Sequence, residues 1–242
     1  MSSVVVITGA GGALGGAISR RLAAEPDTQL VLSDVSEATL AATVESVGGE
    51  VDTVLADVSD EASVAAVVAH AVDRFGRLDV YIGNAGVLSP NGRIHNLTPA
   101  DWERAFRINV LGSANGIKAA VGAMRPQGSG SIVLTASVSG LTAWSHAAPY
   151  CATKAAVIQL AKVAAVEYAR DGIRVNCVCP GTFRSAIHDD LPPEALDPIA
   201  ARHPLGLGAA DDIAGAYAFL ASDAARWTTG SALVVDGGYS AP

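Results

Sequence analysis

Cysteine is scarce in this chain of 242 residues, which contains only Cys151, Cys177 and Cys179. The number is odd, and all three lie late in the sequence. A disulfide-stapled domain needs paired cysteines spread along the chain. We therefore expect free thiols and a protein of the reducing cytoplasm.

Positive charge is also in short supply, because 16 Lys and Arg stand against 24 Asp and Glu and give a formal net charge of −8. A surface that neutralises phosphate backbones needs the opposite balance, so we predict no nucleic-acid partner. Long apolar runs are missing too. The run Val4–Ile7 is far shorter than a membrane span of about 20 residues, and no basic segment precedes it. We predict neither a membrane anchor nor a secretory signal.

Metal-ligand spacing is absent as well. Cys177 and Cys179 lack the second pair that a zinc site requires. The histidines are scattered at positions His70, His95, His146, His188 and His203. The sequence predicts no metal site.

Apolar residues, in contrast, make up 50% of the chain, enough for one well-buried core at this length. Short β-branched runs without polar alternation are typical of parallel strands that are covered on both faces. The runs are Val4–Thr8, Gln29–Ser33, Val51–Ala56, Leu78–Ile82, Ser131–Thr135, Arg174–Cys179 and Ala232–Val235.

Helical patterns separate these runs from one end of the chain to the other. An apolar stripe from Val64 to Phe75 follows the helical repeat, and Thr98, Pro99 and Asp101 form the start signal of a later helix. The alternation predicts an α/β fold, a Rossmann-like doubly wound parallel sheet of about seven strands in a single domain over residues 1–242. The irregular stretch 182–204 is predicted to be a substrate loop within it.

The first strand runs into the glycine-rich segment TGAGGALG, residues 8–15, and then into a helix. Strand, glycine turn and helix in this order predict a dinucleotide site, because glycine lets the backbone approach a pyrophosphate and the helix start presents free N–H groups to it. Asp34 ends the second strand, where a carboxylate can bind an adenosine ribose and repel a 2′-phosphate. This favours NAD, although Asp34 could instead cap the next helix.

Other polar and small residues follow later strands. Asp57 ends the third strand, and the tetrapeptide GNAG ends the fourth at residues 83–86. The carboxyl ends of parallel strands meet at one edge of the sheet, where ligands bind. We expect both segments to border the cofactor.

Tyr150 and Lys154 are four residues apart on a predicted helix, so their side chains share one face. A free phenol with a pKa of about 10 is a poor base at neutral pH, but a neighbouring ammonium and a cationic nicotinamide favour its ionised form. Ser137 follows the fifth strand and can hydrogen-bond the same substrate oxygen. The trio predicts acid–base chemistry on a hydroxyl or carbonyl group.

Taken together, these segments resemble the short-chain dehydrogenase/reductase family, in its single-domain branch, over nearly the whole chain. The resemblance rests on TGAGGALG, Asp34, Asp57, GNAG, Asn109 in INVLG, Ser137 in TASVSG, YCATK at 150–154 and PGT at 180–182. It implies that Tyr150 is the general acid/base, that Ser137 orients the reacting oxygen, and that Lys154 binds the nicotinamide ribose and lowers the tyrosine pKa. Asn109 would hold a water that continues the proton relay.

The resemblance also implies which residues contact the ligands. The cofactor would be bound by Gly9, Gly12, Ala13, Leu14, Gly15, Asp34, Val35, Asp57, Val58, Asn84, Ala85, Gly86, Tyr150, Lys154, Pro180, Gly181 and Thr182. The substrate would be lined by Val138, Leu141, Trp144, His146, Phe183 and Ile187, with Leu191 and Leu196 adding to the apolar wall. Cys151 is expected to be a small packed residue, and His146 could instead belong to a solvated loop.

Ala13 departs from the pattern, because the single-domain branch usually has glycine there. Gly9, Gly12 and Gly15 instead match the spacing of the extended branch, whose members include epimerases and dehydratases. Those members carry a further substrate domain, for which the six residues after Asp236 leave no room.

The interpretation is an NAD-dependent oxidoreductase that interconverts a small or medium secondary alcohol and its ketone. The alternatives are an acyl-carrier-protein reductase, which acidic residues near the substrate loop disfavour, and a non-catalytic NAD-binding regulator, which would typically lack the tyrosine. Small residues along the helix 150–170 and the helix before it permit close packing, and the resemblance implies a homotetramer whose subunits meet through these helices and the last strand.

Overall fold

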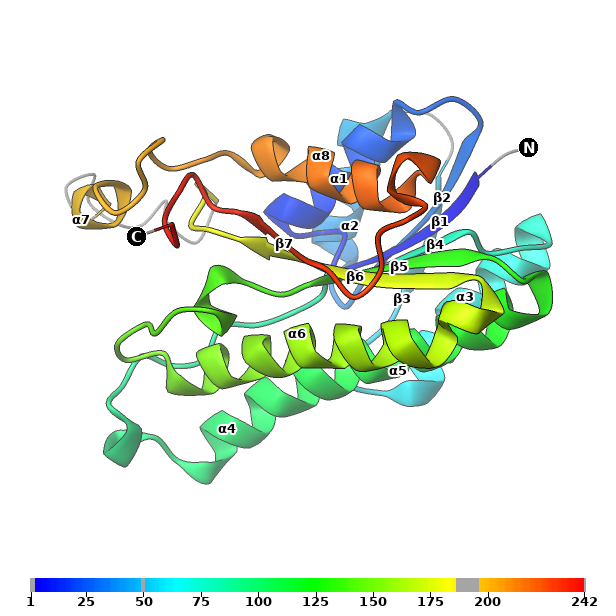
Figure 1. Ribbon diagram of the computed structural model, residues 1–242. Coiled ribbons are helices and arrows are strands. Elements are labelled where there is room, and N and C mark those ends of the chain that lie inside the picture. The colour runs from blue at the N-terminus through cyan, green and yellow to red at the C-terminus, as the bar shows by residue number, and fades with distance from the viewer. Residues whose placement is uncertain (1–2, 49–50, 186–195, 242) are drawn as a thin grey trace.

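The computed structural model describes residues 3–48, 51–185 and 196–241. All seven described strands form one parallel sheet in the order β3-β2-β1-β4-β5-β6-β7 (Figure 1). The strands are β1 (Ser3–Thr8), β2 (Thr28–Asp34), β3 (Asp52–Leu55), β4 (Val80–Gly83), β5 (Gly130–Thr135), β6 (Ile173–Pro180) and β7 (Ala232–Val235). The predicted Rossmann-like doubly wound sheet is confirmed.

Helices cover both faces of the sheet (Figure 1). One face is covered by α1 (Ala13–Ala23), α2 (Glu37–Val47) and α8 (Ala210–Ala221), whose apolar side chains share a core cluster with β1 and β2. The other is covered by α3 (Glu61–Phe75), α5 (Gly112–Met124) and α6 (Ala148–Tyr168). The shorter helices are α4 (Pro99–Ala105) and α7 (Asp197–Ala200). Within the described residues, no helix is long and apolar enough to cross a membrane.

The apolar runs fall on the strands, with boundaries that differ by one or two residues. The central strands β2, β1, β4, β5 and β6 are buried along most of their length, as the absence of polar alternation predicts. The two edge strands are less buried: β3 alternates between half-buried and exposed residues, and β7 has no fully buried residue. Each edge strand has a neighbour on one side only.

The predicted helix signals also lie where the sequence places them. Thr98 is the N-cap of α4, with Pro99 in the first turn, and the Asp101 carboxylate accepts a hydrogen bond from the Thr98 amide at 2.8 Å. Residues Phe106–Leu111 form a π-helical stretch between α4 and α5, in which backbone hydrogen bonds join residues five positions apart instead of four.

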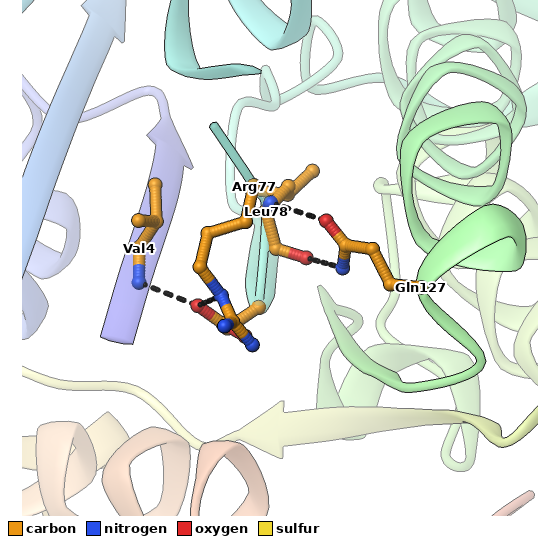
Figure 2. A network of polar contacts seen from close by, with 5 residues as sticks. Val4, Arg77, Leu78 and Gln127 are labelled. Atoms are coloured by element: carbon orange, nitrogen blue, oxygen red, sulfur yellow. Dashed lines mark hydrogen bonds and ion pairs between the residues drawn. The ribbon is translucent and has the colours of Figure 1, made fainter. Parts of the chain in front are cut away.

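A polar network joins β1 to the start of β4 at the amino ends of the strands (Figure 2). The Asp79 carboxylate accepts a hydrogen bond from the Val4 amide at 2.9 Å, and Arg77 binds the same carboxylate with its Nε and Nη2. The Gln127 side chain accepts from the amide of Leu78 at 2.9 Å and donates to its carbonyl at 2.8 Å. The network aligns β4 with its neighbouring strands, and so fixes where the carboxyl end of β4 lies.

Candidate active site

The glycine turn after β1 is shaped by contacts that only glycine allows. Gly9 has a φ of +66°, and a Cβ there would lie 2.6 Å from Cα of Ala85. A Cβ at Gly15 would overlap the Gly9 carbonyl oxygen, whereas one at Gly12 would lie 3.5 Å from that atom, an ordinary contact. The backbone therefore folds tightly onto itself and delivers the start of α1, with its free N–H groups, to the edge of the sheet.

Asp34 stands at the end of β2, beside this turn. One carboxylate oxygen accepts a hydrogen bond from the Gly11 amide at 2.9 Å, and the other accepts from the Ser36 amide at 3.1 Å. The N-cap of α2 is Ser36, whose hydroxyl accepts from the Thr39 amide. Asp34 is thus not the cap of this helix, and its charge lies next to the glycine turn.

A partly buried chain of hydrogen bonds ties the glycine turn to the neighbouring strands. The Asn84 amide donates to the Gly9 carbonyl at 3.0 Å and accepts from the Thr135 hydroxyl at 3.1 Å. The Thr135 hydroxyl has then used its proton, so Tyr217 of α8 donates to it across 2.7 Å. The chain fixes GNAG against both the turn and β5.

A cavity of about 520 Å³ opens at this edge. Its lining joins segments that are far apart in the sequence. Of the predicted site residues, it includes Gly9, Gly12, Ala13, Leu14, Gly15, Asp34, Asn84, Ala85, Gly86, Ser137, Trp144, Tyr150, Lys154, Pro180, Gly181, Thr182 and Phe183.

Sequence reasoning missed other parts of the lining, namely Gly11, Val87, Leu88, Thr135, Ala136 and Ser185. Each lies within two or three residues of a strand end or of a motif already identified. The signal that could have found them is this adjacency, because consecutive residues of a loop at the sheet edge tend to face the same crevice.

Several predicted residues do not line the cavity. Val138 is fully buried in the core, and Leu141 is 49% exposed. His146 is exposed, with its Nδ1 2.8 Å from the Ser145 hydroxyl. Val35, Asp57 and Val58 lie outside the lining, and Ile187 and Leu191 lie outside the described residues. The predicted substrate wall is thus reduced to Trp144 and Phe183, since the loop after Ser137 turns its other side chains inward or to solvent.

Two expectations about the loop 182–204 also change. Leu196 is buried but lies outside the cavity lining. Residues Asp197–Ala200 form the short helix α7, so the segment is not irregular throughout. Pro198 lies at the first turn of this helix, where its missing N–H costs nothing.

The start of α6 brings Tyr150 and Lys154 together with Ser137, which follows β5. Lys154 is 4% exposed; its ammonium lies 5.7 Å from the centre of the Tyr150 ring and donates to the Thr135 carbonyl at 2.7 Å. Ser137 is also 4% exposed. Its hydroxyl accepts from the Ser139 amide at 3.1 Å and forms a hydrogen bond with Tyr150. The hydroxyl groups of Ser137 and Tyr150 can therefore contact one oxygen atom, with the Lys154 ammonium beside the Tyr150 ring.

The pKa values differ from the expectation that Lys154 makes Tyr150 acidic. Burial raises the pKa of Tyr150, and the hydrogen bond with Ser137 only partly offsets this. Burial also lowers the pKa of Lys154 to about 8. Burial thus acts against the predicted effect of Lys154, because removing both side chains from water disfavours the phenolate and the ammonium alike.

Asn109 lies in the π-helical segment and is buried. Its side chain accepts from the Val87 amide at 2.8 Å and donates to the Val87 carbonyl at 2.9 Å and to Thr153 at 3.0 Å. Asn109 thus pins the segment after GNAG to α6. With its side-chain amide committed to these partners, Asn109 borders the Tyr150–Lys154 helix without lining the cavity.

Two further observations concern a possible metal site and a second cavity. Over residues 3–48, 51–185 and 196–241, no three His, Cys, Asp or Glu side chains lie close enough together to hold a metal ion. A larger cavity of about 1180 Å³ lies at the amino ends of the strands, among residues such as Ser3, Val80 and Trp227. It contains none of the residues of the predicted site, and in open parallel sheets ligands bind at the carboxyl ends.

The cavity at the carboxyl ends suits a dinucleotide. The tight turn leaves no room for a Cβ at Gly9 or Gly15, which brings backbone close to where a pyrophosphate would sit, and Asp34 lies at the far end from Tyr150. The residues present therefore fit a nicotinamide cofactor.

Comparisons with known proteins agree with this geometry. A sequence profile of the family described as enoyl-(acyl carrier protein) reductase matches residues 9–240. The cis-4-hydroxycyclohexanecarboxylate dehydrogenase of Sinomonas cyclohexanicum is 41% identical over 241 residues, which cover 98% of this chain and 96% of that protein. The levodione reductase of Leifsonia aquatica is 39% identical, covering 98% and 94%. The crystal structure of a levodione reductase has a TM-score of 0.94 at 38% identity, covering 99% of this chain and 98% of that one.

Proposed function

The chain belongs to the short-chain dehydrogenase/reductase family of oxidoreductases, and from this premise we propose that it interconverts a secondary alcohol and its ketone with NAD. The observation that supports the proposal most is the meeting of Ser137, Tyr150 and Lys154 with the glycine turn in one cavity. A bound nicotinamide would supply the chemistry of taking up or giving back a hydride.

The roles of the side chains follow from their atoms. In the oxidation direction, the Tyr150 oxygen accepts the proton of the substrate hydroxyl while the Ser137 hydroxyl holds the same oxygen in place. In the reduction direction, Tyr150 returns this proton to the carbonyl oxygen. Lys154 would bind a ribose hydroxyl of the cofactor, and its charge, 5.7 Å from the centre of the Tyr150 ring, would favour the phenolate. Gly9, Gly12 and Gly15 would hold the pyrophosphate, and Pro180–Thr182 would border the nicotinamide.

We propose a small or medium substrate that is fairly apolar or cyclic. The apolar wall of the cavity that holds Tyr150 includes Val87, Leu88, Trp144 and Phe183, which carry large apolar surfaces. The Sinomonas relative is named for a hydroxylated cyclohexane ring. A ring of this size with one secondary hydroxyl fits the same kind of wall.

An oxidation screen tests the proposal. Purified protein is mixed with a panel of cyclic and acyclic secondary alcohols, with NAD⁺ and NADP⁺ in parallel, and absorbance at 340 nm is followed. We expect NADH to form well beyond one equivalent per subunit. A single equivalent would instead indicate an epimerase-type use of bound cofactor, and no NADH at all would indicate a regulator that only binds NAD.

Acyl-carrier-protein reduction is the second candidate, because the matching family profile carries an enoyl-(acyl carrier protein) reductase description. The formal net charge of −8 disfavours an acidic carrier partner. Adding an acyl thioester with NADH and with NADPH to the screen separates the two candidates.

Asp34 is expected to set the preference for NAD over NADP. A carboxylate and a 2′-phosphate about 4 Å apart repel each other by roughly 4 kcal/mol at an effective dielectric of 20. Asp34→Asn removes the charge and keeps the side-chain oxygen that accepts from Gly11 or Ser36, so the kcat/KM ratio of NAD⁺ to NADP⁺ should fall at least tenfold. Asp34→Ala should also weaken the binding of both cofactors, since the Gly11 amide of the glycine turn then loses its acceptor. An unchanged ratio in both variants would show that Asp34 only organises the turn.

Alcohol oxidation is expected to rise with pH. Burial raises the pKa of Tyr150, so the protonated phenol dominates near neutrality, and the base form grows as pH increases. Burial lowers the pKa of Lys154 to about 8. Above this pH Lys154 loses the positive charge that favours the phenolate, so the rise in the oxidation rate should level off. Ketone reduction should show the opposite slope. A kcat/KM profile from pH 6 to 10 measures both, and a flat oxidation profile would contradict the role of Tyr150.

We propose a homotetramer in the cytoplasm. Val163 and Val166 on α6 are 44% and 82% exposed, and Val234 on the edge strand β7 is 38% exposed. Exposed apolar side chains on a helix and an unpaired strand edge are typical of surfaces between subunits.

A further inference from the structure

His203 is a buried histidine that the reaction proposed above does not use. It follows α7, and its side chain is held between two segments of the chain, with 3% of its surface exposed. The ring Nδ1 lies 2.8 Å from the Ile199 carbonyl oxygen, and the ring Nε2 lies 3.2 Å from the Thr182 backbone nitrogen.

These two partners fix the protonation of the ring. A carbonyl oxygen only accepts a hydrogen bond, so Nδ1 must carry a proton. A backbone N–H only donates, so Nε2 must be bare. His203 is therefore a neutral imidazole with its proton on Nδ1, and a second proton would remove the acceptor that Thr182 uses.

Thr182 lies on the wall of the candidate active site. It follows Pro180 and Gly181 at the end of β6, and all three line the cavity. The Gly181 amide donates to the Val235 carbonyl at 2.9 Å, and the Arg184 amide donates to the Gly208 carbonyl at 2.9 Å. The segment is thus fastened on both sides of Thr182, and His203 holds the amide between these two anchors.

The ring of Tyr239 keeps His203 in place. The two ring centres are 4.8 Å apart. Tyr239 also contacts the Arg202 guanidinium, which lies 4.5 Å from the centre of the Tyr239 ring. The centre of the Trp144 ring lies 6.2 Å from that of Tyr239. Trp144 also lies 6.2 Å from Tyr150. α7 and the last residues of the chain lie together beyond the carboxyl ends of the strands (Figure 1).

Asp236 and Arg202 are charged residues near His203. Asp236, at the end of β7, is close enough that a charge on His203 would lower its pKa. Its carboxylate is engaged by the amides of Gly238 and Ser240 and by the Ser240 hydroxyl. Arg202 carries a positive charge beside the Tyr239 ring, 4.5 Å from its centre.

We propose that neutral His203 is a positioning residue for the cofactor: by accepting from the Thr182 amide, it holds Pro180–Thr182 where the nicotinamide end binds. The inference rests on the proposed function, because the place of the cofactor in the cavity is part of it.

The experiment compares two substitutions that separate the acceptor from the ring. His203→Gln can keep an acceptor for Thr182 and cannot be protonated, whereas His203→Phe keeps the ring against Tyr239 and has no acceptor. The dissociation constant of NADH is measured by fluorescence at pH 8. His70→Gln is the matched control, since His70 binds Asp52 between α3 and the edge strand β3.

The expected results differ between the variants. His203→Phe should weaken NADH binding about three- to tenfold, the range for one lost hydrogen bond, while His203→Gln and His70→Gln stay near wild type. Equal affinities of wild type and His203→Phe, or a loss in His203→Gln as large as that in His203→Phe, would overturn the inference.

A second measurement does not depend on the cofactor. Long-range ¹H–¹⁵N spectra of the imidazole nitrogens, with the His203 signals assigned by their loss in His203→Gln, should show Nδ1 protonated and Nε2 bare at pH 8. A proton on Nε2 would refute the inference even if the enzyme is active. Failure of the wild type to bind NADH would remove the proposed function as well, whereas tight wild-type binding with an unaffected His203→Phe would remove this inference alone.

Discussion

Tyr150→Phe is expected to abolish alcohol oxidation while leaving NADH affinity nearly unchanged. The substitution removes one oxygen, which is the proton acceptor and the partner of Ser137, and keeps the ring that faces Trp144 and Lys154. General acid–base catalysis contributes about 10²- to 10⁴-fold, so kcat should fall by at least this range. Steady-state kinetics and NADH fluorescence titration measure the two quantities.

A matched control lies on the same helix. Tyr168 is at the carboxyl end of α6 and packs beside the core cluster, away from the cavity lining. Tyr168→Phe should retain wild-type kcat. If Tyr150→Phe kept even a tenth of the wild-type kcat, the proton would have another acceptor and the proposed mechanism would be wrong.

Gly15→Ala is expected to have the second large effect, on cofactor binding. A methyl group at residue 15 would overlap the Gly9 carbonyl oxygen and lie 2.8 Å from Cα of Ala10, so the turn or the start of α1 must move. Forced overpacking costs about 1–3 kcal/mol. NADH affinity should therefore fall about 10- to 100-fold, and thermal unfolding should shift down by several degrees.

Gly12→Ala provides the comparison, because its added methyl group would lie 3.5 Å from the same carbonyl oxygen and its φ of −78° suits alanine. We expect a small change in the unfolding temperature. If Gly12→Ala lowered this temperature as much as Gly15→Ala, the space around the turn would not be what distinguishes the two glycines.

The sequence predicted the parallel sheet well because each central strand is buried on both faces. Such a strand needs apolar residues along its whole length, and these form a continuous apolar run in the sequence. β3 is the weaker case. It is an edge strand with one neighbour, so its burial alternates and its true extent, Asp52–Leu55, is shorter than the apolar run Val51–Ala56. Local pattern cannot tell a central strand from an edge strand, since this depends on pairing with distant segments.

In the candidate site, too, some residues could be predicted from the sequence and others could not. The spacing of Tyr150 and Lys154 fixes their common face on a helix, and the glycine turn is encoded within eight residues. The substrate wall could not be predicted as well: Val138 turns into the core and Leu141 and His146 turn outward, because the path of this loop depends on packing against other segments. The contact of Thr182 with His203, 21 residues later, left no local signal.

By itself, the sequence determined which chemistry is available: the phenol, the ammonium, the hydroxyl and the glycine turn are fixed by residue type and short spacing. The tertiary structure decided how these groups are tuned. Burial is a property of the whole fold, and it raises the pKa of Tyr150 and lowers that of Lys154, opposite to what the pair suggests in isolation. Desolvation depends on every segment that covers a side chain, and no short stretch of sequence contains that information.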